Sequence, residues 1–237
     1  MTQPRWTREE AGLLSASLLS GLGNGITTLA LPWLVVERTS SAAAAGIVAA
    51  SNAAPMLVLA VFSGLLVDRF GSRRISVLSD TASAASVLSI AVVTASTSAV
   101  WPVAVLAAAG AALDQAGVTA RTALIPVVCA ARGRPTARLN GAYSATSVAG
   151  ATCGPAVAGV LIASTGVQGA LAAAATLSAG AALSILLVRR AAASPALPGT
   201  AGTSGFRAVF LGAGVIAADP LLRFLAVQSF LLFLLFL

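Results

Sequence analysis

Long apolar runs, separated by short polar breaks, make up most of this chain. They predict helices at about residues 11–36, 42–67, 75–97, 101–130, 139–163 and 168–188, with a seventh that begins near residue 221. A helix of about 20 apolar residues crosses the ~30 Å hydrocarbon layer of a bilayer. The runs are unbroken and lack the short alternating pattern of membrane strands. The pattern therefore predicts an all-α membrane protein with six spans and the start of a seventh.

Composition agrees with that pattern and indicates that the chain has three parts. The chain is 58% hydrophobic and 9% charged, and its mean hydropathy is +0.95, whereas a water-soluble domain of 237 residues needs more charges to cover its surface. We expect a six-helix transmembrane part at 1–190, a Pro/Gly/Ser-rich linker at 191–220 and an incomplete helix at 221–237. Because the last apolar run is shorter than a span, we expect a fragment or the product of a truncated gene.

The basic residues predict the orientation. All 14 are arginines, and most fall on one side of the predicted bundle: Arg5, Arg8, Arg69, Arg73, Arg74, Arg132, Arg134, Arg138, Arg189, Arg190 and Arg207. Arg38 lies on the other side. By the positive-inside rule, the N-terminus, the 64–74 loop and the linker are cytoplasmic. Because the arginines are dispersed at the ends of apolar runs, they favour a topology signal over a nucleic-acid-binding face.

The loop at 64–74 has the most distinctive spacing in the chain. It contains two glycines, which permit a tight turn and a close approach of the helix ends, together with an acid and three arginines that can pair with carboxylates or lipid phosphates. These residues are Gly64, Asp68, Arg69, Gly71, Arg73 and Arg74. The spacing G-x-x-x-D-R-x-G-x-R-R resembles the loop between helices 2 and 3 of major facilitator superfamily transporters. That resemblance implies a gating loop whose aspartate docks on a second half of the transporter.

Small residues in the predicted fifth helix form a second signal. Gly150, Gly154 and Ala158 recur every four residues and share one face, where another helix can approach closely. Pro155 removes a backbone hydrogen bond and bends the helix. With Gly141 and Gly159, the pattern resembles the fifth helix of major facilitator exporters and antiporters, which implies export rather than sugar import.

Polar residues within the predicted spans are candidates for a substrate or proton pathway. One face of the first span carries Ser17, Ser20, Asn24, Thr27 and Thr28, which either line a cavity or bond back to their own helix. The fourth span contains Asp114, Gln115 and Arg121. Intramembrane charges are costly, so we expect Asp114 to carry protons.

The two charges of the fourth span are seven residues apart. That spacing places them on one face but ~10 Å apart along the axis, too far for a direct pair. Each therefore needs another partner, water or substrate. Arg121 alternatively reaches the cytoplasmic interface. Asp80 is expected to pair with a nearby arginine in a structural role.

The stretches 23–33 and 114–126 also resemble the macrolide-efflux and siderophore-exporter branch of the superfamily. The resemblance implies a cell-membrane protein that exports small hydrophobic or amphiphilic molecules by alternating access, coupled to protons, and the Ala-, Gly- and Arg-rich composition without lysine indicates a bacterial source. A missing C-terminal half is then its partner, alongside the bilayer. Two alternatives remain open: an importer of the same superfamily, and a truncated membrane remnant that does not transport.

Enzymatic readings are disfavoured by what the sequence lacks. There is no histidine, which excludes Ser-His-Asp and Cys-His catalysis. Cys129 and Cys153 stand apart in apolar runs and suit packing better than a metal site or a disulfide. No Gly-rich loop with a phosphate-binding lysine is present. We therefore expect no enzymatic activity, no cofactor and no metal.

Overall fold

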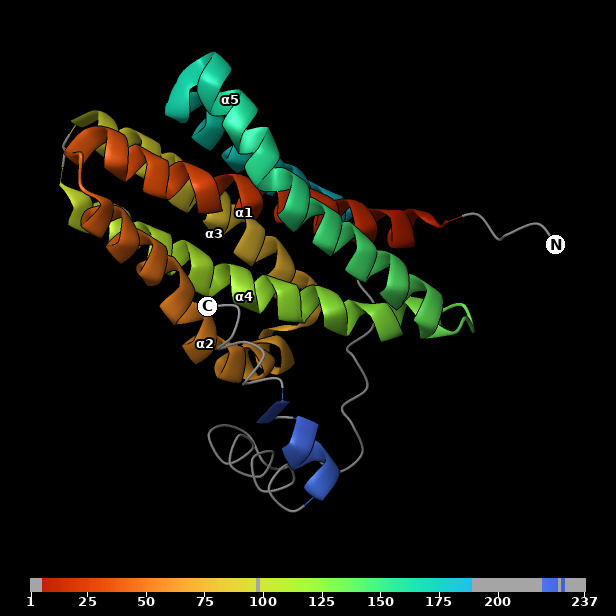
Figure 1. Cartoon of the computed structure of the whole chain (residues 1–237). Helices are drawn as coiled ribbons and strands as arrows, with labels where there is room; N and C mark the ends of the chain where they lie inside the picture. Colours follow the sequence, from red (N-terminus) through yellow and green to blue (C-terminus); the bar gives the residue numbers. More distant parts are fainter. Residues whose placement is uncertain (1–5, 97–98, 189–218, 226, 229–237) are drawn as a thin grey trace. The chain divides into compact units, whose positions relative to one another are not determined.

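The computed structural model describes residues 6–96, 99–188, 219–225 and 227–228, and every regular element in these ranges is a helix (Figure 1). The chain divides into two compact units, Met1–Ser194 and Pro195–Leu237. The first unit contains α1 (Arg8–Thr39), α2 (Ala42–Phe70), α3 (Ser72–Ser96), α4 (Val100–Ala130) and α5 (Thr136–Leu186). The predicted all-α architecture is confirmed.

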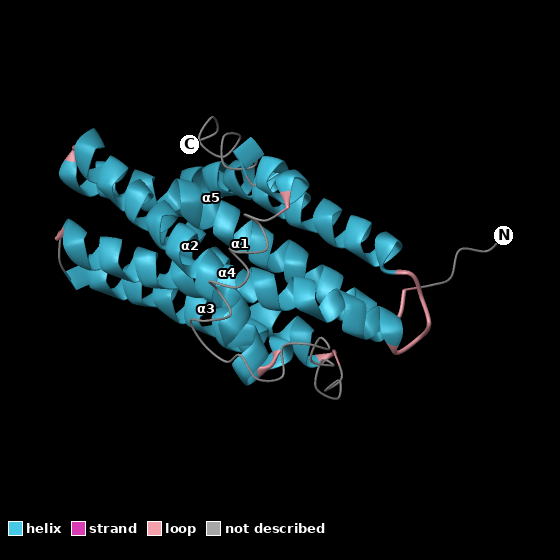
Figure 2. Ribbon diagram, turned by 90° about the horizontal axis from the view of Figure 1, so that it is seen from below, coloured by secondary structure: helices cyan, strands magenta, loops and turns pink. Residues whose placement is uncertain are grey.

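Several helices have the length and composition of membrane spans. Within the described part of the chain, α1, Ser72–Thr94 of α3, α4 and α5 are long and apolar enough to cross a bilayer. The described apolar stretch of α2 is shorter, at Ala42–Asn52. Figure 2 shows the helices of this unit side by side. The unit is therefore a bundle of membrane-length helices.

Local capping explains where α1 begins and ends. The Thr7 hydroxyl accepts a hydrogen bond from the Glu10 N–H at 3.3 Å, and the Glu10 carboxylate accepts one from the Thr7 N–H at 2.8 Å. This reciprocal pair satisfies two backbone donors that a helix start leaves free. At the far end, Ser40 adopts a left-handed conformation with φ 53°, and the Ser41 side chain caps α2. The chain thus reverses direction between α1 and α2.

The turn between α2 and α3 consists of one residue. Gly71 has φ +86°, a conformation that residues with a Cβ rarely adopt, and it lies between Phe70 and Ser72. The predicted tight turn is confirmed. The expectation that the approach of the helix ends depends on missing side chains is wrong, because a Cβ built on Gly64 or Gly71 would meet no heavy atom within 4 Å.

The fifth and sixth predicted spans form the two arms of α5. Gly166 interrupts the helix with φ 75° and ψ 174°, between the arms at 136–165 and 167–186. Along α1, Gly21 and Gly25 meet Gly150 and Gly154 in the same order, whereas Gly12 and Gly23 meet the second arm in reverse order, near residues 184 and 174. The arms are therefore antiparallel, and α1 packs against both.

In the second unit, residues 220–225 and 227–228 are helical, and the Asp219 carboxylate accepts the Leu221 N–H at 2.8 Å. The rest of the predicted seventh span and residues 189–218 of the predicted linker lie outside the described residues. The limits of the three predicted parts of the chain therefore stay predictions.

Candidate functional site

A polar network inside the bundle joins α1, α3 and α4. At its centre the Arg121 guanidinium donates from Nη1 to both carboxylate oxygens of Asp80, at 2.8 and 2.9 Å. The Arg121 side chain is 2% exposed and that of Asp80 is fully buried. The expectation that Arg121 reaches the membrane interface is therefore wrong. Asp80 does pair with an arginine, but the partner is Arg121 of α4 and not one of the nearby arginines of the 64–74 loop that the sequence suggested.

The second guanidinium nitrogen faces α1 and the other acid of the network. Nη2 of Arg121 donates to the Ser20 hydroxyl at 3.1 Å and lies 4.0 Å from Oδ1 of Asp114. The expectation that Asp114 and Arg121 are too far apart to interact is wrong. Helical side chains lean toward the N-terminus, so the long arginine reaches back along α4 and shortens the separation.

Two side chains of α1 hold Asp114. The Asn24 amide donates to Oδ2 of Asp114 at 2.6 Å, and the Ser20 hydroxyl donates to Oδ1 at 3.4 Å. The Asp114 side chain remains 14% exposed, more than either Asp80 or Arg121. The network contains one basic group and two acidic groups, so one of the two acids has no basic group of its own. That acid is the accessible member of the network.

The rest of the predicted polar face of α1 is divided between two roles. Ser17 donates to the Tyr143 carbonyl on α5 at 3.5 Å, so it contacts another helix. Thr27 and Thr28 instead donate to carbonyls of their own helix. Gln115 is half-buried, and within the described residues its side chain makes no hydrogen bond. The network therefore includes Asn24, Asp114 and Arg121 but neither Thr28 nor Gln115.

The 64–74 loop contacts the bundle through one of its arginines. Arg73 donates from Nε to the Val188 carbonyl at 2.8 Å and from Nη2 to the Leu186 carbonyl at 3.3 Å. It therefore binds the C-terminal end of α5, where the backbone carbonyls lack helical partners. No pattern in the sequence indicated this contact.

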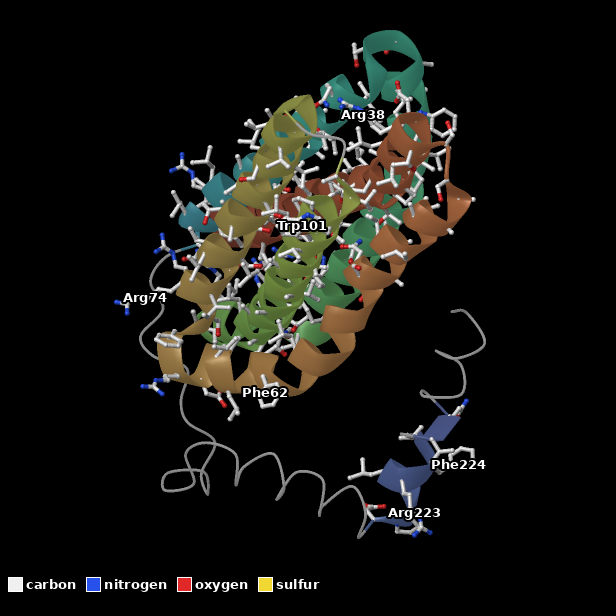
Figure 3. All side chains as sticks on the ribbon, turned by 90° about the vertical axis from the view of Figure 1, so that its left-hand side faces the viewer. Arg38, Phe62, Arg74, Trp101, Arg223 and Phe224 are labelled. Atoms are coloured by element: carbon white, nitrogen blue, oxygen red, sulfur yellow. The ribbon has the colours of Figure 1, made fainter. Side chains whose placement is uncertain are left out.

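The other charged residues of the loop point elsewhere. Arg69 lies over the Phe70 ring at 5.7 Å, and Arg74 is exposed and extends away from the helices (Figure 3). Asp68 is exposed and forms no hydrogen bond or ion pair with any described residue. The acid of the loop is therefore available to a partner outside the described bundle.

The glycine face of α5 forms the predicted seam with α1. A Cβ on Gly154 would lie 2.6 Å from Cα of Gly25, and one on Gly150 would lie 2.9 Å from the Leu18 carbonyl oxygen. Ala158 of the same face is fully buried. Gly141 and Gly159 lie off the seam, since a Cβ on either would meet no heavy atom within 4 Å.

Ion pairs at one end of the bundle connect the start of α1 to the segment between α4 and α5. Arg132 and Arg134 lie 3.6 and 3.3 Å from Glu9 and Glu10, and the Arg138 guanidinium stacks on Trp6 at 4.2 Å. From the sequence, these arginines were predicted only as topology signals. The two glutamates in the first turn of α1 are a sequence feature from which acidic partners could be predicted.

The fold and the site together define a helical membrane protein with a polar network buried in an otherwise apolar interior. The model of the major facilitator superfamily matches residues 13–237, and the chain belongs to this family. The resemblance inferred from the 64–74 loop and the fifth helix is therefore confirmed.

Curated relatives are bacterial efflux pumps. Multidrug efflux pump Tap of Mycobacterium tuberculosis is 36% identical over 158 residues, which make up 65% of this chain and 38% of that protein. Tap of Mycolicibacterium fortuitum is 36% identical over 158 residues and is covered to 39%. The match thus spans about two fifths of the length of these relatives. No solved structure matches the chain.

Proposed function

We propose that this chain forms the N-terminal bundle of a transporter that exports small hydrophobic or amphiphilic molecules by alternating access, driven by protons. The observation that carries the proposal is Asp114, a partly accessible acid held inside the bundle by Asn24 and Ser20. Ionised groups within a membrane are costly and mark substrate or ion pathways. The similarity to multidrug efflux pumps supports export and small-molecule substrates.

The charge of the network supports an exchange at Asp114. Asp80 and Arg121 neutralise each other as a buried pair, so Asp114 carries the remaining negative charge. Either a proton or a positively charged group of the substrate neutralises it. A site that accepts one or the other, but not both together, couples the uptake of protons to the release of substrate.

We also propose that the 64–74 loop is a cytoplasmic gate. Asp68 is exposed and has no partner in the described bundle, which suits docking on a helix of a second, C-terminal half. In alternating access, the two halves rock about a binding site near the midplane of the membrane. The proposal places the loop and the N-terminus in the cytoplasm of a bacterial cell.

The test is efflux of a fluorescent amphiphilic cation, ethidium, from bacteria that lack their own pumps. We expect a gene that encodes this chain followed by a second six-helix half to lower dye retention. Asp114→Asn removes the charge but keeps the shape of the side chain, and it should abolish the efflux driven by a proton gradient. Glu37→Gln, which changes an exposed acid at the end of α1, is the matched control and should leave efflux unchanged.

Two results would contradict the proposal. Unchanged efflux in the Asp114→Asn variant would remove Asp114 from the proton pathway. Efflux by the 237-residue chain alone would show that a second half is not required.

A further inference from the structure

Asp80 takes no direct part in the exchange described above, yet it controls the arginine next to Asp114. We propose that Asp80 is a positioning residue that holds the Arg121 guanidinium away from Asp114 and so leaves Asp114 free to bind a proton or a cation. This inference rests on the proposed function of Asp114 and assigns a second acid to the same site.

The geometry assigns different partners to the two guanidinium nitrogens. Nη1 of Arg121 lies within 2.9 Å of both Asp80 oxygens, whereas Nη2 stays 4.0 Å from Asp114. The Ser20 hydroxyl accepts from Nη2 and donates to Asp114, so it stands between the two charges. Asp80 therefore has the close, hydrogen-bonded ion pair, whereas Asp114 has a long ion pair at 4.0 Å and a contact through the Ser20 hydroxyl.

Close packing of α3 against α4 maintains this arrangement. The Ser79 hydroxyl donates to the Leu113 carbonyl, and a Cβ on Gly117 would collide with the Ser79 side chain. The same Cβ would lie 3.5 Å from Nη1 of Arg121. The absent side chain at Gly117 thus lets the residue before Asp80 approach α4 and sets the position of the carboxylate.

Few charged or titratable groups act on this site in the described residues. Asp114 interacts electrostatically with Arg121 on its own helix and with Asp80 on α3. Arg121 also interacts electrostatically with Tyr143 on α5. From α1 the site receives only the uncharged side chains of Ser20 and Asn24. Two carboxylates therefore lie within reach of the Arg121 guanidinium, and the one that it binds closely is that of Asp80.

Removing the charge of Asp80 should redirect Arg121. A buried guanidinium without a counterion is strongly unfavourable, and the carboxylate of Asp114 lies 4.0 Å away. In the Asp80→Asn variant we expect Arg121 to pair with Asp114. An aspartate in a full ion pair with arginine stays ionised and is closed to protons and to cationic substrates.

The experiment measures protonated Asp114 directly. A hydrophobic carbodiimide such as dicyclohexylcarbodiimide modifies protonated carboxyl groups in apolar sites, and tandem mass spectrometry separates Asp114 from Asp80. In the full-length protein, we expect labelling of Asp114 in the wild type and a decrease of about tenfold or more in Asp80→Asn. The double variant Asp80→Asn/Arg121→Gln should restore labelling, because no guanidinium remains to close on Asp114. Asp80→Glu should keep both labelling and efflux.

Three labelling results would each overturn the proposal: no labelling of Asp114 in the wild type, unchanged labelling in Asp80→Asn, and no recovery in the double variant. A purely structural role of Asp80 would lower the yield of folded protein without this pattern. If Asp80→Asn does not fold, labelling of the double variant decides the question. Labelling at the wild-type level supports the proposal, and its loss overturns it.

The measurement separates this proposal from the proposed function. Labelling does not require transport, so the expected pattern in a protein without efflux would support the role of Asp80 and contradict the export function. Efflux that persists in Asp80→Asn, with Asp114→Asn inactive, would overturn the role of Asp80 and leave the export function intact.

Discussion

Arginine residues of this protein differ in role according to what surrounds them. Arg121 is buried and paired with an acid, Arg74 is exposed, and Arg73 binds the last carbonyls of α5. A cation at a helix C-terminus is favoured by the partial negative charge of the free carbonyls. Arg73 therefore ties the short α2–α3 turn to the end of α5.

Replacing Arg73 with glutamine should loosen this end of α5. Loss of hydrogen bonds from a charged donor costs about 1.5–3 kcal/mol, so we expect amide exchange at residues 183–188 to be about ten to a hundred times faster. Hydrogen–deuterium exchange in detergent measures it. Arg74→Gln, one residue further along, is the control and should leave the exchange unchanged. Equal effects of the two variants would mean that Arg73 does not cap α5.

Among the elements, α1 and the first arm of α5 pack with their backbones in direct contact. Gly25 and Gly154 meet backbone to backbone, and Pro155 leaves the Ala151 carbonyl without its helical partner. A Cβ on Gly25 would lie 3.2 Å from that carbonyl oxygen. The bare glycine backbones thus bring the two helices into contact at the turn that contains Pro155.

The seam yields a prediction with a matched control on the same helix. Gly154→Ala places a methyl group against Gly25 and should lower the free energy of unfolding by about 1–3 kcal/mol. Gly159→Ala points into open space and should be neutral or stabilising by up to about 1 kcal/mol, because alanine favours helix. Thermal unfolding in detergent compares the two. Equal midpoints would show that the helices separate readily and that the seam is loose.

At the scale of the first unit, contacts between distant segments gather the arginine-rich ends of several helices. Arg132 and Arg134 pair with the first turn of α1, and Arg73 binds the end of α5. These contacts place four chain segments at one end of the bundle. The positive-inside rule assigns that end to the cytoplasm, and the orientation stays a prediction.

Accessibility of single cysteines tests the orientation. In a background with Cys129→Ala and Cys153→Ser, we expect a membrane-impermeant maleimide to label Arg74→Cys only in inside-out vesicles. Glu37→Cys should react only in right-side-out vesicles, because α1 carries it to the opposite end. Both parent residues are exposed, so burial does not limit the reaction. The reverse pattern would mean that the N-terminus faces outward.

Several elements followed from local properties of the sequence. Helices of membrane length follow from apolar runs, because each residue in a run contributes to burial in lipid without regard to its partners. The tight turn at Gly71 and the break at Gly166 fall in the expected loops. The face formed by Gly150 and Gly154 follows from the helical repeat alone.

Pairings across helices depended on the tertiary structure. The sequence predicted that Asp80 meets an arginine but did not identify Arg121, and it predicted no contact between Arg121 and Asp114. Helix packing brings α3 and α4 together at Gly117. The flexible Arg121 side chain then reaches Asp114, although the rise of the helix places the two backbone positions too far apart for a direct pair.

Local sequence was enough to predict which segments are long and apolar enough to cross a membrane, where they turn and which faces are small or polar, because these properties depend on neighbours within one helix. Which charges meet, and which acid keeps only a long contact with the arginine, became visible in the packed bundle. These contacts depend on the registers of α1, α3 and α4 against one another, which no single helix encodes.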